Sequence, residues 1–304
     1  MSLTIHVQQK AGDNAQRILN SYLQKCREAL ELKDAHQAIH ESRKQMKKIR
    51  AFNRLHRYSI SEKKYQMTNT YYRDIARLMS DARDATAMLE SLRHISEDLE
   101  GEAQEKAFRD IKNHMISRKS AVSRNKINQG KLLDQVKASL SRAEKINTSW
   151  RVKRDGFDAY HGGLKKVYKD CQKAMKKTYK KESDANFHDW RKRVKDLRYQ
   201  IAYLEEVWKL PMQGLEEELH QLTDYLGVHN DLAVLKAYIQ QMDYDHQEAI
   251  TALVSLIESK QKNLRKHARP LGAKLLYEPK SEFVDRIAFY WQMRLKESKL
   301  LQAT

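Results

Sequence analysis

Two stretches of the chain, IHESRKQMKKIR (residues 39–50) and FHDWRKRVKDLR (residues 187–198), share one pattern of residue types. Counted from its histidine, each has Arg at +3, Lys at +4, Lys at +7 and Arg at +10, with apolar residues at −1, +6 and +9. Steps of three and four keep side chains on one side of an α-helix, so each stretch predicts an amphipathic helix with an apolar and a cationic stripe. The cationic positions, each 148 residues from its counterpart, are His40, Arg43, Lys44, Lys47, Arg50, His188, Arg191, Lys192, Lys195 and Arg198.

The correspondence extends beyond these two stretches. SDARDATAML (residues 80–89) resembles GVHNDLAVLK (residues 227–236) at an offset of 147. Further pairs, at offsets of 148 or 147, are Arg17 with Lys165, Lys25 with Lys173, Asp84 with Asp231, Arg118 with Arg265 and Lys119 with Lys266. Matches in one order with one residue of drift predict an internal duplication. We therefore expect an N-terminal tail (residues 1–10) and two halves (residues 11–150 and 151–304), which tend to pack as pseudo-symmetric helical bundles.

The composition predicts a polyanionic partner. The 304 residues include 58 Lys and Arg against 40 Asp and Glu, a formal net charge of +18. Such a charge favours nucleic acid, an anionic membrane surface or a phosphate polymer as partner. The two cysteines lie far apart in the sequence, which argues against a disulfide framework and for a reducing compartment. With no apolar run of about 20 residues and no signal peptide, the sequence predicts a cytoplasmic protein that does not enter a membrane.

Hydrophobic periodicity predicts an all-α fold, because no segment alternates with the period of two that is typical of strands. Gly and Pro are scarce, at 9 and 3 residues, which suits long helices. We expect Pro211 to end the second histidine helix and Pro270 to interrupt a later one. The expected helices are at about 11–32, 36–57, 62–80, 84–99, 102–127, 130–148, 158–181, 185–209, 213–226, 231–243, 246–268 and 281–301.

The cationic stripes need either water or an anion around them. Like charges at i,i+4 cost roughly 0.2–0.5 kcal/mol per pair, unless solvent or a ligand offsets the repulsion. The Arg fork fits phosphate oxygens, Lys adds point charge, and His can donate a hydrogen bond. A solvated face is the alternative for any single lysine, but the repeated register favours binding. The helix before the second histidine adds a further cationic face with Lys165, Lys169, Lys173 and Lys176.

Signatures of enzymes and metal sites are thin. His36 and His40 have a spacing that can ligate zinc, but the pair is not repeated and no HExxH pattern is present. Phosphate-binding loops, dinucleotide-binding loops and nucleophile elbows are also missing from the sequence. We interpret Asp84 and Asp231 as helix caps or as members of internal ion pairs. The sequence therefore predicts a non-enzymatic protein with no cofactor and no metal site.

The paired HxxRKxxKxxR helices, the R-D and N-D segments after them, and GLKKVYKDCQKAM (residues 163–175) resemble the CHAD family, the conserved histidine α-helical domain. LYEPKSEFVDRIAFYW (residues 276–291) resembles the end of the family's second half. The resemblance implies two four-helix-bundle-like units related by a pseudo-twofold axis around a basic central groove or pore. It also implies binding of inorganic polyphosphate, often at polyphosphate granules.

Carried onto this chain, the resemblance assigns polyphosphate contacts to the ten stripe residues and to Lys165, Lys169, Lys173 and Lys176. We extend the expected surface to Arg17, Lys25, Arg118, Lys119, Tyr199, Arg265 and Lys266. Asp196 is acidic where the first copy has Lys48, and the lysines before His188 suggest that the second half carries more of the binding. The alternative is a nucleic-acid-binding protein, for which the charge fits but no aromatic-basic motif is evident. A phosphate-handling enzyme is a third class.

Overall fold

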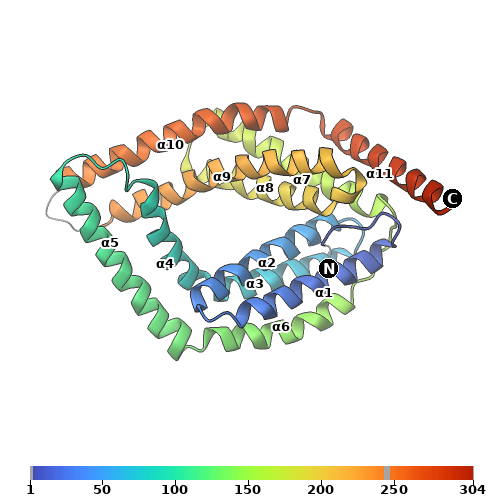
Figure 1. Cartoon of the computed structure of the whole chain (residues 1–304), viewed down its shortest axis with the longest axis horizontal. Helices are drawn as coiled ribbons and strands as arrows, with labels where there is room; N and C mark the ends of the chain where they lie inside the picture. Colours follow the sequence, from blue (N-terminus) through green and yellow to red (C-terminus); the bar gives the residue numbers. More distant parts are fainter. Residues whose placement is uncertain (1–2, 243–246, 304) are drawn as a thin grey trace.

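The computed structural model describes residues 3–242 and 247–303, and every regular element within those ranges is helical (Figure 1). The all-α prediction is confirmed. Parts of four expectations lie outside the described residues: residues 1 and 2 of the expected tail, residue 304 of the expected second half, and the ends at residues 243 and 246 of two expected helices.

Side-chain caps fix where several helices of the first half begin. The carboxylate of Asp34 accepts the backbone N–H groups of His36 and Gln37, and the hydroxyl of Ser61 accepts that of Lys64. Such caps satisfy backbone donors that have no partner within the helix. The elements are α1 (Ala11–Leu30), α2 (Ala35–Leu55), α3 (Glu62–Leu78), α4 (Ser80–Ser91), the 3₁₀ turn η1 (Leu92–His94), α5 (Glu102–Val122), the π-helical η2 (Ser123–Gln129) and α6 (Leu132–Thr148).

The second half begins with a helix pair like α1 and α2. Ser183 caps the second histidine helix by accepting the backbone N–H of Asn186. The elements are α7 (Asp158–Lys180), α8 (Asp184–Tyr203), the 3₁₀ turn η3 (Glu205–Val207), α9 (Lys209–Ile239), α10 (Gln247–Leu275) and α11 (Lys280–Ala303).

Both proline predictions were wrong. The second histidine helix ends at Tyr203, and Pro211 lies in the first turn of α9, where its missing N–H removes no intrahelical bond. Pro270 lies inside α10, which continues to Leu275. The two helices expected at 213–226 and 231–243 form one continuous helix in the described part of the chain, because Gly227 costs only about 1 kcal/mol in a helix that is held by packing.

The two repeated aspartates are not helix caps, contrary to one of the two interpretations offered above. Asp84 lies inside α4, whose N-cap position is Met79, and Asp231 lies inside α9. Burial lowers the pKa of Arg43 and of Lys47, and the carboxylate of Asp84 opposes that shift at both, which favours the other interpretation, an internal electrostatic interaction.

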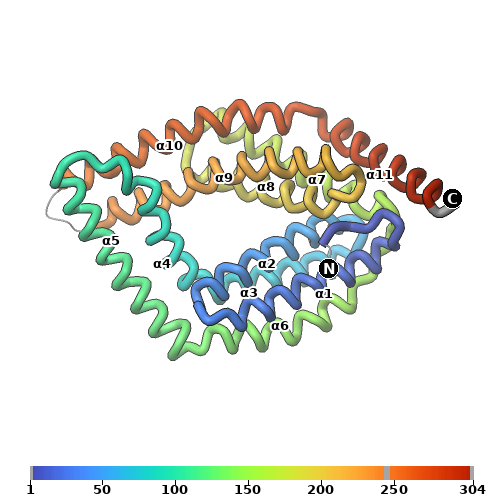
Figure 2. The backbone as a smooth tube through the Cα atoms, viewed as in Figure 1, coloured from blue at the N-terminus to red at the C-terminus, as the bar shows by residue number. Residues whose placement is uncertain are grey.

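Two apolar cores hold the molecule together, and each mixes residues from both sides of position 150. The larger core joins Ile18 and Phe52 to Trp190 and Trp291, and the smaller joins α4 and α5 to α9 and α10. Figure 2 shows the backbone path, with α6 along the lower edge, α10 along the upper edge and α5 running between them on the left. The expected duplication and its pseudo-twofold axis remain predictions.

The described part of the N-terminal segment is packed rather than free. Ile5 is fully buried, and its backbone N–H donates to the carbonyl of Tyr203 at 2.7 Å. Cys26 and Cys171 are both buried and unbonded, as expected from their separation in the sequence.

Candidate functional site

The site is built where α2 and α8 pack against each other. Their apolar stripes are buried as the spacing predicts, with Ile39, Met46 and Ile49 on α2 and Phe187, Val194 and Leu197 on α8. Polar contacts also cross the junction. The amide of Gln200 donates to the carbonyl of Ala51 at 3.2 Å, the hydroxyl of Tyr203 donates to the carbonyl of Lys48 at 2.9 Å, and Arg54 pairs with Asp196 at 3.2 Å.

Five predicted site residues gather at this junction, and we call them the central basic cluster: Arg43, Lys47, Arg191, Lys195 and Arg198. Lys47 has Arg43 and Arg191 as its nearest cationic neighbours, and Lys195 has Lys47, Arg191 and Arg198. Arg191, Lys195 and Arg198 share one face of α8 because they are four and three residues apart. Cations from two helices that are far apart in sequence therefore form one surface.

The two lysines of the central basic cluster have lowered pKa values. Burial and, after it, the neighbouring cations lower the pKa of Lys47 to about 8 and that of Lys195 to about 7. Yet Lys47 is exposed to water and Lys195 is partly exposed. The protein around each side chain reduces its solvation, which disfavours the charged form even though water still reaches it.

Three members of the central basic cluster make no direct hydrogen bond or ion pair within the described protein. Among the described residues, Lys47, Lys195 and Arg191 make no hydrogen bond and no ion pair. The Nε atoms of Arg191 and Arg43 are both buried without an acceptor. Unpaired cations at a partly buried site are costly, so this arrangement favours an anionic ligand.

The other two arginines of the central basic cluster are held in place. Arg43 donates through Nη1 to the hydroxyl of Ser80 at 2.9 Å, and Arg198 pairs with Glu216 at 2.5 Å. Arg191 instead lies over α9, where a Cβ added to Gly227 would be 3.5 Å from its Nε. That distance is an ordinary van der Waals contact, so the guanidinium packs closely against α9 at this position.

On one side the surface continues into a hollow of about 440 Å³, whose lining includes Lys25, Lys48 and Arg198, three tyrosines, and the acidic residues Glu205 and Glu216. The Lys48 ammonium lies 5.9 Å from the centre of the Tyr199 ring, and the Lys195 ammonium lies at the same distance from it. Burial raises the pKa of Tyr199 to about 12, so its hydroxyl stays protonated at neutral pH and can donate.

On the other side of the central basic cluster, neighbouring polar and acidic groups partly compensate the positive charge. Arg50 donates to Asn69 at 3.1 Å, and burial lowers its pKa to about 10. Burial raises the pKa of Asp196, and the neighbouring Arg54 and Arg50 oppose that shift. Two of the predicted lysines form ion pairs with acids one turn before them, Lys44 with Glu41 at 3.4 Å and Lys192 with Asp189 at 3.3 Å. Because these pairs are exposed, they contribute little to stability.

The two repeated histidines lie at the ends of this surface. The Nδ1–H of His188 donates a hydrogen bond to the Oδ1 atom of Asn230, and His40 lies beside Arg83. Burial lowers the pKa of both imidazoles, so the neutral form dominates at neutral pH. His36 bonds to Thr86 at 2.9 Å and to Ser123 at 2.7 Å rather than joining His40.

Arg83 and Asn230 are site residues that the sequence analysis did not single out. They are 147 residues apart and stand just before Asp84 and Asp231, so the repeat itself contained the signal. Within the part of the chain that the structure describes, no group of three or more His, Cys, Asp and Glu side chains could hold a metal ion. In the same residues, no helix is long and apolar enough to cross a bilayer.

The CHAD domain family profile matches residues 17–240, which include both histidine helices and the whole central basic cluster. The chain belongs to the CHAD domain family. Its fold is similar to the crystal structure of the CHAD domain from the plant Ricinus communis, with a TM-score of 0.65, 14% identity, and coverage of 92% of this chain and 96% of that one. It is also similar to PptA from Streptomyces chartreusis, with a TM-score of 0.61, 12% identity, and coverage of 89% and 100%. A search of curated proteins finds no match.

Several predicted contact residues of this CHAD domain lie away from the central basic cluster. Lys165, Lys169, Lys173 and Lys176 lie on the face of α7 opposite the residues that α7 buries, and Lys266 is exposed on α10. Arg265 donates to His229 at 3.0 Å and pairs with Glu182 at 3.2 Å. Arg17 donates to Asn14 at 2.7 Å, and Arg118 lies over the Tyr238 ring on α9 at 5.4 Å. Lys119 is close to His36.

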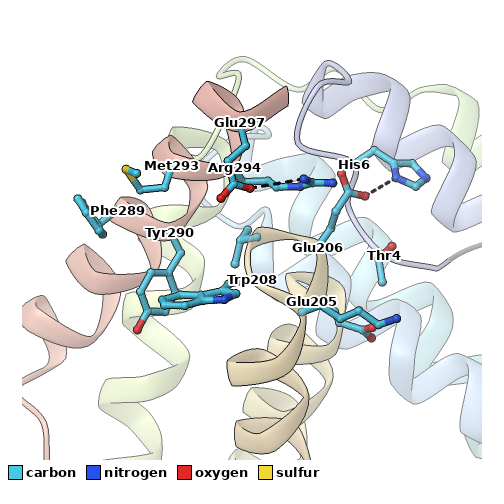
Figure 3. Close-up of a pocket in the computed structure, with 12 residues that line it drawn as sticks. Thr4, His6, Glu205, Glu206, Trp208, Phe289, Tyr290, Met293, Arg294 and Glu297 are labelled. Carbon is cyan, nitrogen blue, oxygen red and sulfur yellow. Dashed lines mark hydrogen bonds and ion pairs between the residues drawn. The ribbon is translucent and has the colours of Figure 1, made fainter. Parts of the chain in front are cut away.

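Another hollow of this CHAD domain, about 630 Å³, has a different character (Figure 3). It lies between the N-terminal segment, η3 and α11, and Trp208, Phe289 and Met293 form its apolar wall. Its charged residues pair with one another, His6 with Glu206 at 2.5 Å and Arg294 with Glu297 at 3.6 Å. Internal pairing leaves no excess of cations there, so we assign this hollow no part in anion binding.

Proposed function

We propose that this CHAD domain binds inorganic polyphosphate through the central basic cluster and catalyses no reaction on it. The observation that carries the proposal is the set of cations without a direct hydrogen bond or ion pair, Lys47, Arg191 and Lys195, where α2 packs against α8. Arg offers phosphate a bidentate fork and Lys a mobile point charge. Cations from two helices, Lys47 on α2 and Arg191 and Lys195 on α8, suit a chain of phosphates that contacts both helices.

The flanking surfaces extend the proposed path of the polymer. Lys25 and Lys48 continue the positive charge into the neighbouring hollow, and His188 and His40 lie toward the other ends of α8 and α2. A neutral His40 can donate one hydrogen bond to a phosphate oxygen, whereas His188, whose single neutral-form N–H already donates to Asn230, can donate to phosphate through Nε2 only when it is protonated. We propose recruitment to polyphosphate granules as the biological outcome, which a fluorescent fusion would test by co-localisation.

Nucleic acid is the competing ligand. Single-strand binders normally present aromatic faces for stacking beside the basic surface. Here Tyr22 and Tyr199 are only 2% and 7% exposed, so neither offers a face to a base. We therefore expect long polyphosphate to displace RNA and single-stranded DNA from the protein far better than they displace polyphosphate.

The decisive measurement compares two triple variants that lose the same charge. Arg191→Ala, Lys195→Ala, Arg198→Ala removes three central cations, and Lys165→Ala, Lys169→Ala, Lys176→Ala removes three outward ones. Only the first should abolish polyphosphate binding, with helicity unchanged in both. Binding by the unmodified chain should weaken steeply with salt because counterions are released. Equal losses in the two variants would refute the assignment to the central basic cluster, and phosphate release from polyphosphate by the unmodified chain would refute the non-enzymatic assignment.

A further inference from the structure

We propose that Lys195 is a site of acylation by acyl phosphates, with Arg191 and Lys47 holding the phosphate group while the Lys195 amine attacks the acyl carbon. The proposal shares one premise with the proposed function, that the central basic cluster binds phosphate. It adds a covalent modification and a small-molecule class that polyphosphate binding does not require.

The geometry places an amine between phosphate-binding groups. Lys195 lies one turn after Arg191 and one turn before Arg198 on the same face of α8, and Lys47 approaches from α2. Its Nζ lies 5.9 Å from the centre of the Tyr199 ring, and no carboxylate among the described residues pairs with it. Water reaches the side chain, so a small solute can reach it as well. An acyl phosphate held through its phosphate group by Arg191 and Lys47 would bring its carbonyl carbon to the neighbouring amine.

The amine is also in a reactive form. Burial and the surrounding cations lower the pKa of Lys195 to about 7, so about half of the side chains are neutral at pH 7. A desolvated lysine beside other cations is a recognised way to activate this nucleophile. An ordinary lysine is neutral in fewer than about one in a thousand molecules at that pH.

The reaction is a simple acyl transfer that needs no further reagent. The Nζ lone pair forms a bond to the carbonyl carbon, and the bond from that carbon to the bridging oxygen breaks. Inorganic phosphate leaves, still neutralised by Arg191 and Lys47, and the nitrogen loses a proton to the departing phosphate or to water. The product is an amide at Lys195, which has lost its ability to carry charge.

This chemistry would link the binding site to the supply of activated acyl groups. Acylation removes one of the cations that the proposed polymer needs, so the modified protein should bind polyphosphate more weakly. A bound polymer would in turn protect Lys195 by occupying Arg191 and Lys47. Polyphosphate and acyl phosphates would thus compete for one site.

The test treats the full-length protein briefly with acetyl phosphate at about pH 7 and measures the initial rate of acetylation at each lysine by peptide mass spectrometry. Lys169 and Lys176, which have no protein partner among the described residues and lie outside the central basic cluster, are the internal controls. The larger neutral fraction of Lys195 raises its acetylation rate, and the lower nucleophilicity of this less basic amine offsets part of that gain. We therefore expect a rate at Lys195 about ten-fold or more above that of the control lysines. Equal rates at the three lysines would overturn the proposal.

A second reagent separates phosphate docking from general nucleophilicity. 4-Nitrophenyl acetate transfers the same acetyl group but carries no phosphate. In Arg191→Gln, the ratio of the acetyl phosphate rate to the 4-nitrophenyl acetate rate at Lys195 should fall about ten-fold, because the phosphate loses a charged partner. An unchanged ratio would overturn the docking role, whatever happens to the pKa of Lys195.

Polyphosphate distinguishes failure of this inference from failure of the proposed function. Selective acetylation of Lys195 that polyphosphate does not slow would support the inference and refute polymer binding at this site. Polyphosphate binding with no selective acetylation would refute the inference alone. Lys195→Arg controls for acetylation of other lysines. Treatment with acetyl phosphate should lower the polyphosphate affinity of the unmodified sequence. The Lys195→Arg variant should bind polyphosphate with the same affinity before and after that treatment.

Discussion

Replacing Arg191 by Gln should weaken polyphosphate binding without destabilising the fold. The side chain makes no hydrogen bond or ion pair with any described residue, so its Nη donors are free for a ligand, while its Nε is buried. A hydrogen bond to a charged group contributes about 1.5–3 kcal/mol, which corresponds to a loss of affinity between roughly ten-fold and 150-fold.

The stability of Arg191→Gln follows from the repulsion that the variant relieves. Arg191 lies one helical turn from Lys195 and acts on Lys47 as well. A solvated i,i+4 pair of like charges costs about 0.5 kcal/mol at most. At an effective dielectric constant of about 20 and a separation of about 6 Å, the cost rises to about 3 kcal/mol. Gln keeps most of the packing over Gly227, so the free energy of unfolding should stay the same or rise.

Arg265→Gln is the matched control, with the opposite pattern expected. The Arg265 guanidinium bonds to His229 and Glu182 and lies 5.0 Å from the centre of the Phe187 ring. Its loss should lower the free energy of unfolding by about 1–3 kcal/mol and leave the affinity unchanged. Urea unfolding gives the stability, and titration with polyphosphate of fixed length gives the Kd. The reasoning is refuted if Arg191→Gln binds as tightly as the unmodified chain, or loses as much stability as Arg265→Gln.

Two further predictions concern protons and packing. The lowered pKa values of Lys47 and Lys195, about 8 and about 7, mean that the unfolded chain binds more protons between about pH 7 and pH 10. The free energy of unfolding of the ligand-free protein should therefore rise with pH across that window, as urea titrations would detect. The double variant Lys47→Met, Lys195→Met should lack this contribution and show a flatter profile. An equally steep profile in the double variant would contradict the assignment. In the packing test, an added Cβ at Gly163 would lie 2.0 Å from the carbonyl oxygen of Leu55, whereas at Gly214 it would meet nothing within 4 Å. Gly163→Ala should lower the free energy of unfolding by about 1–3 kcal/mol or more, while Gly214→Ala should raise it by about 0.5–1 kcal/mol, as measured by thermal unfolding. Equal effects of the two substitutions would show that the contact between α7 and α2 is not tight.

The sequence was sufficient to predict the helices and the inner face of each histidine helix. Apolar residues at −1, +6 and +9 are all buried, because a 3.6-residue period fixes which side chains share a face. Helix ends were less predictable. Pro211 reads as a stop signal in the sequence, but its effect depends on whether it falls in the first turn of a helix or in its interior, and that is set by where α8 ends.

Which cations remain available for a ligand could not be predicted, since that depends on tertiary partners. Arg191 and Arg265 look alike in the sequence, yet the first rests over Gly227 and the second is held by Glu182 and His229. The lysines before His188 match the helical period of a binding face, but that face of α7 points away from its buried side. Charge periodicity defines a stripe on one helix without defining what the stripe faces.

The junction of α2 and α8 explains how the chain can hold unpaired cations together. The apolar core runs beneath both helices, and Trp190, Phe52 and Tyr203 are almost fully buried within it. Contacts that involve no cluster residue, such as the one from Gln200 to the Ala51 carbonyl, fix one helix against the other. Burial therefore supplies the free energy that opposes repulsion within the central basic cluster. The cations are positioned before a ligand arrives, so a polyanion that binds there relieves repulsion and needs little rearrangement of the protein.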